Sequence, residues 1–94
     1  LGVGEDGHIA SIFENNKIYA KKEPFFISKN LSEEFYRLSF TFNYLKKIDQ
    51  IIFVLLGNKK KFLIKMINKK KYSKSNIFLN FLSKTKSNVK VFYA

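Results

Sequence analysis

The sequence contains no cysteine, a single proline and a single histidine among its 94 residues. The lack of cysteine excludes a disulfide scaffold and any cysteine-ligated zinc or iron–sulfur site. The one histidine, His8, leaves no histidine pair to hold a metal. The longest uninterrupted apolar run, residues 51–56, is far shorter than the roughly 20 residues of a membrane span. The chain also does not begin with a basic stretch followed by an apolar one, which is the pattern of a signal peptide. We therefore expect a cytoplasmic protein that needs neither a metal nor another cofactor.

Acidic residues are also scarce, with 7 against 18 basic residues and a formal net charge of +11. Such a balance is typical of proteins that bind nucleic acids or anionic membranes. Here all the basic residues except Arg37 are lysines, and Asn, Ile and Phe are abundant too, which indicates the compositional bias of an AT-rich gene. Arginine reads bases and phosphates better than lysine does. We therefore expect neither a nucleic-acid nor a membrane partner, but a surface that suits a small anionic substrate.

Short apolar segments alternate with polar ones along the chain and predict both strands and helices. Strands are expected at residues 25–27, 35–42, 50–56 and 89–93, and short helices at residues 9–13, 43–48, 58–67 and 77–82. Residues 14–22 and 69–76 are polar and are expected to be loops. From Leu38 onward the second strand alternates apolar and hydroxyl side chains, the period of a strand with two different faces.

The strand at residues 50–56 is apolar on both faces, which is typical of a parallel sheet covered by helices on each side. Gly57 ends it, and Asn58 is a plausible N-cap for a helix whose apolar face includes Phe62 and Leu63. This strand–helix order predicts an α/β fold. So small a parallel sheet cannot cover both faces of its central strand. We therefore expect residues 1–94 to be the C-terminal part of a larger α/β domain whose N-terminal half is absent. The alternative is a small α+β domain that self-associates through the exposed sheet.

The segment Gly4-Glu5-Asp6-Gly7-His8 is the strongest candidate for chemistry. A glycine loop after a buried strand brings backbone N–H groups close to a ligand. The Asp6 carboxylate and the His8 imidazole lie two residues apart, and an imidazole in such a loop suits general-base catalysis near neutral pH. By spacing alone, an ordinary glycine-rich turn with a surface histidine is the favoured interpretation.

Residues 1–13 resemble the signature loop of the 6-phosphogluconolactonases, which reads roughly Gly-x-Gly-x-Asp-Gly-His-x-Ala-Ser-Leu-Phe-Pro. Ile12 replaces the leucine, and Glu14 stands in place of the final proline. Residues 37–41 are similar to the family's Arg-Ile-Thr-Leu-Thr strand, and residues 53–60 to its strand ending in Gly-x-x-Lys. The tail lacks the family's Pro-Ala-Ser and Trp-x-x-Asp patterns, so the resemblance covers about the first 65 residues.

The glucosamine-6-phosphate deaminases share the Asp-Gly-His core, but their loop continues His-Ile-Ala-Phe-Asn-Glu-Pro. In this chain Ser11 occupies the position of the phenylalanine, Phe13 that of the glutamate, and Glu14 comes one residue late. The sequence is therefore closer to the lactonases. A deaminase-like isomerase and a truncated, non-catalytic member of the family are the alternatives.

The resemblance implies a Rossmann-like parallel sheet flanked by helices and a reaction, the hydrolysis of 6-phosphogluconolactone in the pentose phosphate pathway. It makes His8 the general base and gives Asp6 an orienting or electrostatic role. Backbone N–H groups near Gly4 or Gly7 would stabilise the oxyanion, as such donors do in acyl transfer.

The resemblance also implies that the arginine of the Arg-Ile-Thr strand and the lysine of Gly-x-x-Lys bind the substrate phosphate. These residues correspond to Arg37 and Lys60. Lys60 also lies near the predicted start of a helix, where an anion is favoured. It belongs to a run of three lysines, residues 59–61, so a neighbouring lysine is an alternative. The acidic pair Glu33 and Glu34 is expected on a solvated loop.

Overall fold

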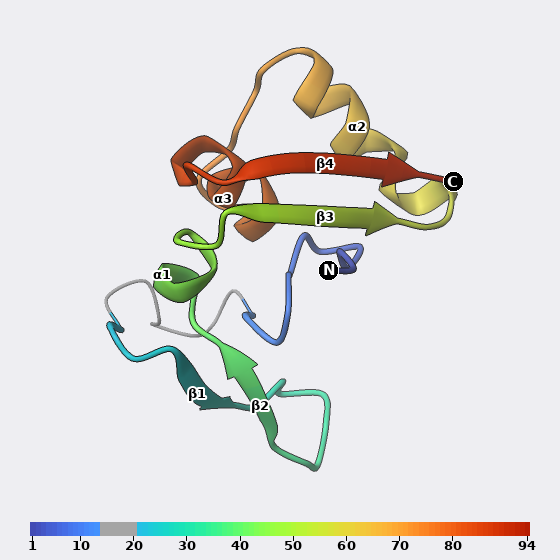
Figure 1. Cartoon of the computed structure of the whole chain (residues 1–94). Helices are drawn as coiled ribbons and strands as arrows, with labels where there is room; N and C mark the ends of the chain where they lie inside the picture. Colours follow the sequence, from blue (N-terminus) through green and yellow to red (C-terminus); the bar gives the residue numbers. More distant parts are fainter. Residues whose placement is uncertain (14–20) are drawn as a thin grey trace.

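The computed structural model describes residues 1–13 and 21–94 and shows a small α/β arrangement (Figure 1). The expected loop at residues 14–22 falls almost wholly outside the described residues. In chain order the elements are β1 (Phe25–Ser28), β2 (Arg37–Phe40), α1 (Phe42–Leu45), β3 (Gln50–Leu55), the 3₁₀ helix η1 (Asn58–Lys60), α2 (Lys61–Asn68), α3 (Ile77–Lys84) and β4 (Asn88–Tyr93).

The strands β3 and β4 form the parallel sheet that the sequence predicted. They pair in register from Gln50 opposite Asn88 to Leu55 opposite Tyr93. The N-terminal segment runs along the free edge of β3, where Gly2 makes a parallel bridge to Val54. The N-terminal segment, β3 and β4 therefore lie side by side in that order (Figure 1). This arrangement brings the loop after Gly2 and the loop after β3 to the same edge of the sheet.

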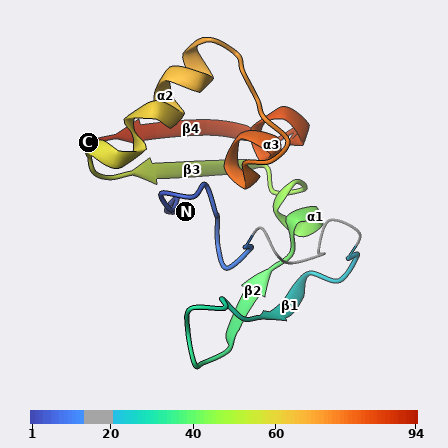
Figure 2. The same ribbon diagram turned by 180° about the vertical axis from the view of Figure 1, so that it is seen from behind.

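Helices α2 and α3 cover one face of this sheet, the face toward the viewer in Figure 2. Along β3 the side chains alternate strictly, so that Ile51, Phe53 and Leu55 are buried while Ile52 and Val54 are exposed. In the described residues helices therefore cover only one face of this strand, which agrees with the expectation that so small a sheet cannot cover both. The apolar sequence of β3 marks a second face that this part of the chain leaves open.

The core between β3 and the two helices contains a group of phenylalanines that contact one another. Phe53 makes edge-to-face contacts with Phe78 and Phe81 of α3, with ring centroids 5.0 and 5.8 Å apart. Phe42 of α1 meets Phe81 in the same way at 5.4 Å. Such pairs add to the stabilisation that burial of the rings already provides. The core therefore fixes α1 and α3 against the start of the sheet.

The strands β1 and β2 form an antiparallel hairpin in which the hydroxyl side chains point inward. Ser28 and Ser39 are buried, whereas the directly opposed Ile27 and Leu38 are 65% and 70% exposed. The predicted alternation is confirmed, and its polar face is the inner one. The reason is a pair of hydrogen bonds to Ser11: its N–H donates to the Ser39 hydroxyl at 3.0 Å, and its carbonyl accepts from the Ser28 hydroxyl at 2.5 Å.

Three local expectations are wrong. Residues 9–13 do not form a helical turn, because Ile9 makes antiparallel bridges to Val3 and Ile12. Asn58 does not cap α2; it begins η1, and Lys60 is the residue before the helix. The second strand is shorter than residues 35–42, because Thr41 is the N-cap of α1, where its hydroxyl accepts from the Tyr44 N–H.

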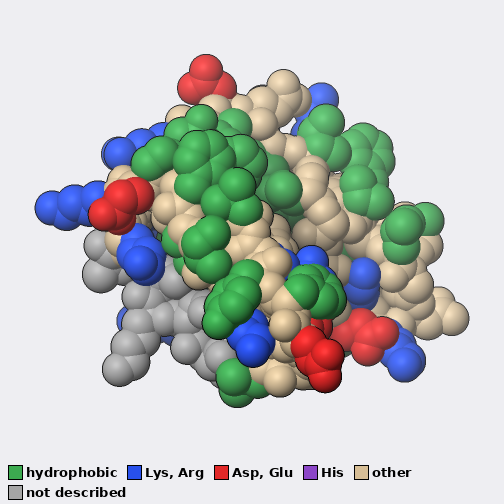
Figure 3. Space-filling model, turned by 90° about the horizontal axis from the view of Figure 1, so that it is seen from below, with side chains coloured by type: hydrophobic (Ala, Val, Ile, Leu, Met, Phe, Trp, Pro, Cys, Tyr) green, Lys and Arg blue, Asp and Glu red, His purple; other side chains and the backbone are tan. Residues whose placement is uncertain are grey.

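Apolar side chains also remain on the surface. Leu63 is the only fully buried residue of α2, and Phe62, assigned to its apolar face by the sequence, is 46% exposed. Figure 3 shows hydrophobic side chains gathered on the lower side of the molecule, with charged groups scattered among them. No helix in the described part of the chain is long and apolar enough to cross a membrane.

Candidate functional site

The centre of the site is a direct contact between Asp6 and His8. The Nδ1 atom of His8 lies 2.6 Å from Oδ1 of Asp6, and the backbone N–H of His8 donates to the same oxygen at 3.0 Å. A carboxylate only accepts hydrogen bonds, so Nδ1 carries the proton and Nε2 is left with its lone pair. The imidazole is one-third exposed and lies against Phe13, with ring centroids 4.9 Å apart. His8 is therefore oriented from two sides with its second nitrogen available.

The electrostatics of Asp6 favour the charged carboxylate. Partial burial raises the pKa of Asp6, but hydrogen bonds from the backbone and ring of His8, together with the charge of the imidazolium, outweigh it. The net result is a pKa below the ordinary value for aspartate. Asp6 is therefore ionised at neutral pH and able to hold the His8 ring in one tautomer.

The start of α3 holds this loop in place. The carbonyl of Gly7 accepts from the N–H of Phe78 at 2.8 Å. Asn76 caps the helix by accepting from the Leu79 N–H at 3.1 Å, and its side chain packs against Gly7. Gly7 has a φ of 86°, a conformation that other residues adopt only with strain. The loop thus needs glycine here both for the backbone angle and for the close approach of Asn76.

We predict that Gly7→Ala will destabilise the chain and disturb the site. A Cβ at this position would overlap the amide of Asn76, and the positive φ adds strain. We expect a loss of about 1–3 kcal/mol in the free energy of unfolding. Urea denaturation measures it, with Gly2→Ala as the control because a Cβ there meets no atom within 4 Å. If Gly2→Ala lowers the free energy of unfolding as much as Gly7→Ala does, the contact between Gly7 and Asn76 is not the cause of the loss.

The expected oxyanion role of the two loop glycines does not fit the hydrogen bonds observed. The N–H of Gly4 donates to the His8 carbonyl at 2.9 Å, and the N–H of Gly7 donates to the Gly4 carbonyl at 3.0 Å. Both amides therefore stabilise the loop itself. A Cβ at Gly4 would overlap the His8 ring, so Gly4 instead makes room for the imidazole.

A hollow of about 450 Å³ adjoins His8. Its lining comes from the N-terminal segment, the site loop, β3 and η1, and consists of Leu1, Gly2, Val3, Gly4, His8, Ala10, Val54, Leu56 and Lys60. Lys60 is thus the lysine of its run that lines the cavity beside His8. Its neighbour Lys59 instead approaches Glu5, with Nζ 3.9 Å from Oε1.

Arg37 lies outside this lining and is engaged by Glu33. Its Nε donates to Oε1 at 2.8 Å and its Nη2 to Oε2 at 2.5 Å, a two-pronged ion pair. The hydrogen bond from Arg37 is the main reason that the pKa of Glu33 lies below its ordinary value, and the charge of a protonated His8 acts in the same direction. Glu33 and Glu34 lie on a loop, as expected, and the structure adds that Glu33 is paired with Arg37. Because residues 33–36 are a loop and not a helix, the spacing of four residues between the two gives no signal for this pair in the sequence.

The site residues come from separate parts of the chain, and the structure joins only some of them. His8, Gly4 and Lys60 share one cavity, with Asp6 behind the imidazole, whereas Arg37 and Glu33 form a separate pair. Within residues 1–13 and 21–94, no three histidine or acidic side chains are grouped closely enough to hold a metal ion.

The architecture is similar to that of several solved structures. The 6-phosphogluconolactonase from Trypanosoma brucei is 21% identical with a TM-score of 0.78, and 98% of this chain matches 37% of that one. The devB protein is 25% identical with a TM-score of 0.79, at 98% and 38% coverage. A putative 6-phosphogluconolactonase from Neisseria gonorrhoeae is 20% identical with a TM-score of 0.77, at 99% and 42% coverage.

The chain thus spans about two-fifths of the length of these structures, and it has their α/β fold with a parallel sheet. A search of curated proteins found no match. The sequence profile of the glucosamine-6-phosphate isomerases and 6-phosphogluconolactonases matches residues 1–87, which include the Asp6–His8 loop, the strands β1, β2 and β3 and all the helices, and end just before β4. The chain therefore belongs to the family of glucosamine-6-phosphate isomerases and 6-phosphogluconolactonases.

Proposed function

We propose that residues 1–94 are the C-terminal part of a cytoplasmic 6-phosphogluconolactonase. The enzyme would hydrolyse 6-phospho-D-glucono-1,5-lactone to 6-phosphogluconate, a step of the oxidative pentose phosphate pathway. The observation that carries this proposal is the Asp6–His8 contact of 2.6 Å beside a cavity that also contains Lys60. The names of the solved structures with the same fold support the lactonase over the isomerase.

In this proposal His8 acts as the general base. Its Nε2 accepts a proton from a water molecule while the water oxygen attacks the lactone carbonyl carbon. The tetrahedral intermediate then collapses, the bond between that carbon and the ring oxygen breaks, and Nε2 of His8 returns its proton to the ring oxygen as it leaves. Asp6 holds the Nδ1 proton throughout and stabilises the imidazolium that forms after the first transfer. No metal or cofactor enters this scheme.

The substrate phosphate is assigned to Lys60 and Arg37. Lys60 already lines the cavity. It is the last residue of η1, the short helix that follows Gly57. Arg37 donates two hydrogen bonds to the Glu33 carboxylate. A bound phosphate would therefore compete with that carboxylate for the guanidinium. Glu33 then becomes a positioning residue that holds Arg37 until the dianion arrives.

The direct test is a product assay. The protein to test is a longer one that contains this chain together with the part of the fold that only the solved structures include. This longer protein should hydrolyse the phosphorylated lactone faster than the lactone hydrolyses spontaneously. It should release no ammonia from glucosamine 6-phosphate. The 94-residue chain alone should show little lactonase activity, because it spans only about two-fifths of those structures. Ammonia release without lactone hydrolysis would favour the isomerase, and no activity in the longer protein would favour a non-catalytic member.

We further predict that removing either proposed phosphate ligand will lower kcat/KM about 10- to 100-fold, since a hydrogen bond to a charged group contributes roughly 1.5–3 kcal/mol. The variants are Arg37→Ala and Lys60→Ala. Arg37→Lys should also be costly because a single ammonium cannot make two parallel hydrogen bonds.

The matched control replaces Lys69, Lys70 and Lys71 together by Gln. This triple variant removes more charge than either single one, yet it should change kcat/KM only through weak steering that salt screens. Kinetics with the phosphorylated lactone at low and physiological salt compare the two effects. If the triple variant loses more activity than Arg37→Ala or Lys60→Ala, the phosphate assignment is wrong.

A further inference from the structure

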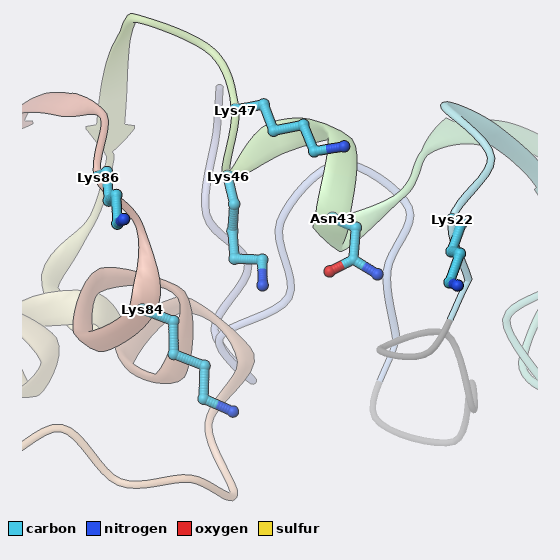
Figure 4. A pocket seen from close by; sticks show the side chains of 6 residues that line it. All are labelled: Lys22, Asn43, Lys46, Lys47, Lys84 and Lys86. Atoms are coloured by element: carbon cyan, nitrogen blue, oxygen red, sulfur yellow. The ribbon is translucent and has the colours of Figure 1, made fainter.

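A second hollow of about 450 Å³ lies away from the His8 cavity, and most of the described residues that line it are lysines. Of these six described residues, five carry a positive charge at neutral pH and none is acidic; they are Lys22, Asn43, Lys46, Lys47, Lys84 and Lys86 (Figure 4). We call this set the lysine hollow. Its lysines come from three segments of the chain, before β1, after α1 and around the end of α3.

The lysine hollow lies at the opposite edge of the sheet from His8. Lys46 and Lys47 come shortly before β3, and Lys84 and Lys86 shortly before β4. Because β3 and β4 are parallel, the starts of both strands meet at one edge, whereas Lys60 follows the end of β3. A strand of six residues is about 20 Å long. One small ligand therefore cannot occupy both the lysine hollow and the His8 cavity.

Hydroxyl groups join the two lysine-bearing segments next to β3 and β4. The Thr85 hydroxyl lies 2.8 Å from the Ser87 hydroxyl and 3.5 Å from the carbonyl of Lys46. The Ser87 hydroxyl donates in turn to the carbonyl of Ile48. These contacts span 39 residues of sequence and hold the lysines on a connected scaffold. The basic groups are therefore gathered by the tertiary structure and not by a single run of lysines.

The charge of the lysine hollow is only weakly offset by its surroundings. None of the three ion pairs found in the described part of the chain includes one of these lysines. The Nζ of Lys46 lies 5.6 Å from the centre of the Phe42 ring, and Lys84 is in the last turn of α3, where a cation is favoured. Among the described residues, Asp49 lines an adjoining hollow that shares Lys46, Lys47 and Lys86.

We propose that the lysine hollow binds a compact anion with two or more phosphate groups, such as a polyphosphate or a doubly phosphorylated sugar. A volume of this size is within the range of small-molecule sites, about 300–1,000 Å³. Several ammonium groups around one space suit an anion with several charges better than a single phosphate. No aromatic side chain is among the described lining residues, so these residues offer nucleobases no surface on which to stack.

The test is the binding of sodium tripolyphosphate to the 94-residue chain, measured by isothermal titration calorimetry at low and physiological salt. The wild-type chain should bind one equivalent, at least about 10-fold more tightly than it binds orthophosphate. The variant Lys46→Gln/Lys84→Gln/Lys86→Gln should weaken binding about 10- to 100-fold. The control Lys69→Gln/Lys70→Gln/Lys71→Gln removes the same charge elsewhere and should change the affinity less than about 3-fold, because exposed charges act on a distant site only through screened attraction.

Equal losses in the two triple variants would overturn the proposal in favour of general surface charge, the outcome expected if abundant lysines are gathered by chance. Absence of tripolyphosphate binding by the wild-type chain would also overturn it, as would much tighter binding of a single-stranded RNA. In case the cluster variant does not fold, amide chemical shifts of the wild-type chain give a second reading. Tripolyphosphate should then move the amides of residues 46–47 and 84–86 and leave that of Lys60 unchanged, and the reverse pattern would contradict the proposal.

Discussion

Replacing His8 by asparagine in the longer protein should lower the rate of lactone hydrolysis by about two to four orders of magnitude, the usual contribution of a general base. Asparagine keeps a polar group next to Asp6, but it has no lone pair of suitable basicity at the position of Nε2. The Asp6 contact and the packing against Phe13 hold the ring in one orientation. Steady-state kinetics, corrected for the spontaneous hydrolysis of the lactone, give the effect.

Glu5→Gln is the matched control for this prediction. Glu5 lies in the same loop and only approaches Lys59 at 3.9 Å, an exposed pair of small energetic value. Its loss should change the rate by less than about 3-fold. The circular dichroism spectrum of each variant should match that of the wild type. A His8→Asn enzyme with the wild-type rate would remove His8 from the mechanism.

Replacing Phe53 by alanine should cost about 3–5 kcal/mol in the free energy of unfolding, the largest effect on stability expected in this chain. Its side chain is fully buried at the centre of the sheet and makes edge contacts with Phe78 and Phe81. Truncation removes this apolar surface and leaves a cavity between β3 and α3. Urea denaturation of the 94-residue chain, followed by circular dichroism, measures the change.

Phe92→Ala provides the comparison, because Phe92 lies on the neighbouring strand β4 but is 58% exposed. It should cost less than about 1 kcal/mol. Similar losses at Phe53 and Phe92 would mean that the face of the sheet away from the helices is covered as well as the one against them. In that case self-association of the chain through this face should appear in analytical ultracentrifugation.

The order of the elements could be predicted from local patterns. The apolar run at residues 50–56 and the alternation at residues 89–93 became β3 and β4, and Asn76 precedes a helix with the expected apolar positions. Errors occurred where a local pattern competed with tertiary contacts. Residues 9–13 look helical in isolation, but Ile9 is fully buried and bridged to Val3, so the segment follows the sheet edge and not its own propensity.

The candidate site was predictable in part for the same reason. Asp6 and His8 are two residues apart, so their contact depends only on a short loop, and the loop motif is long enough to identify. The ion pair between Glu33 and Arg37 was not predicted, because the family resemblance assigned Arg37 to the substrate phosphate. The lysine hollow was not foreseen at all, because its members come from three distant segments.

By itself, then, the sequence determined what depends on neighbouring residues: the α/β order, the glycine loop, the family resemblance and the candidate base His8. Tertiary structure decided what depends on distant residues. It placed Lys60 and not Lys59 beside His8, used the Gly4 and Gly7 amides inside the loop, and turned the serines of the hairpin inward. The physical reason is that hydrogen bonds and charges act over a few ångströms in space, and such distances between remote segments are set only when the core has packed.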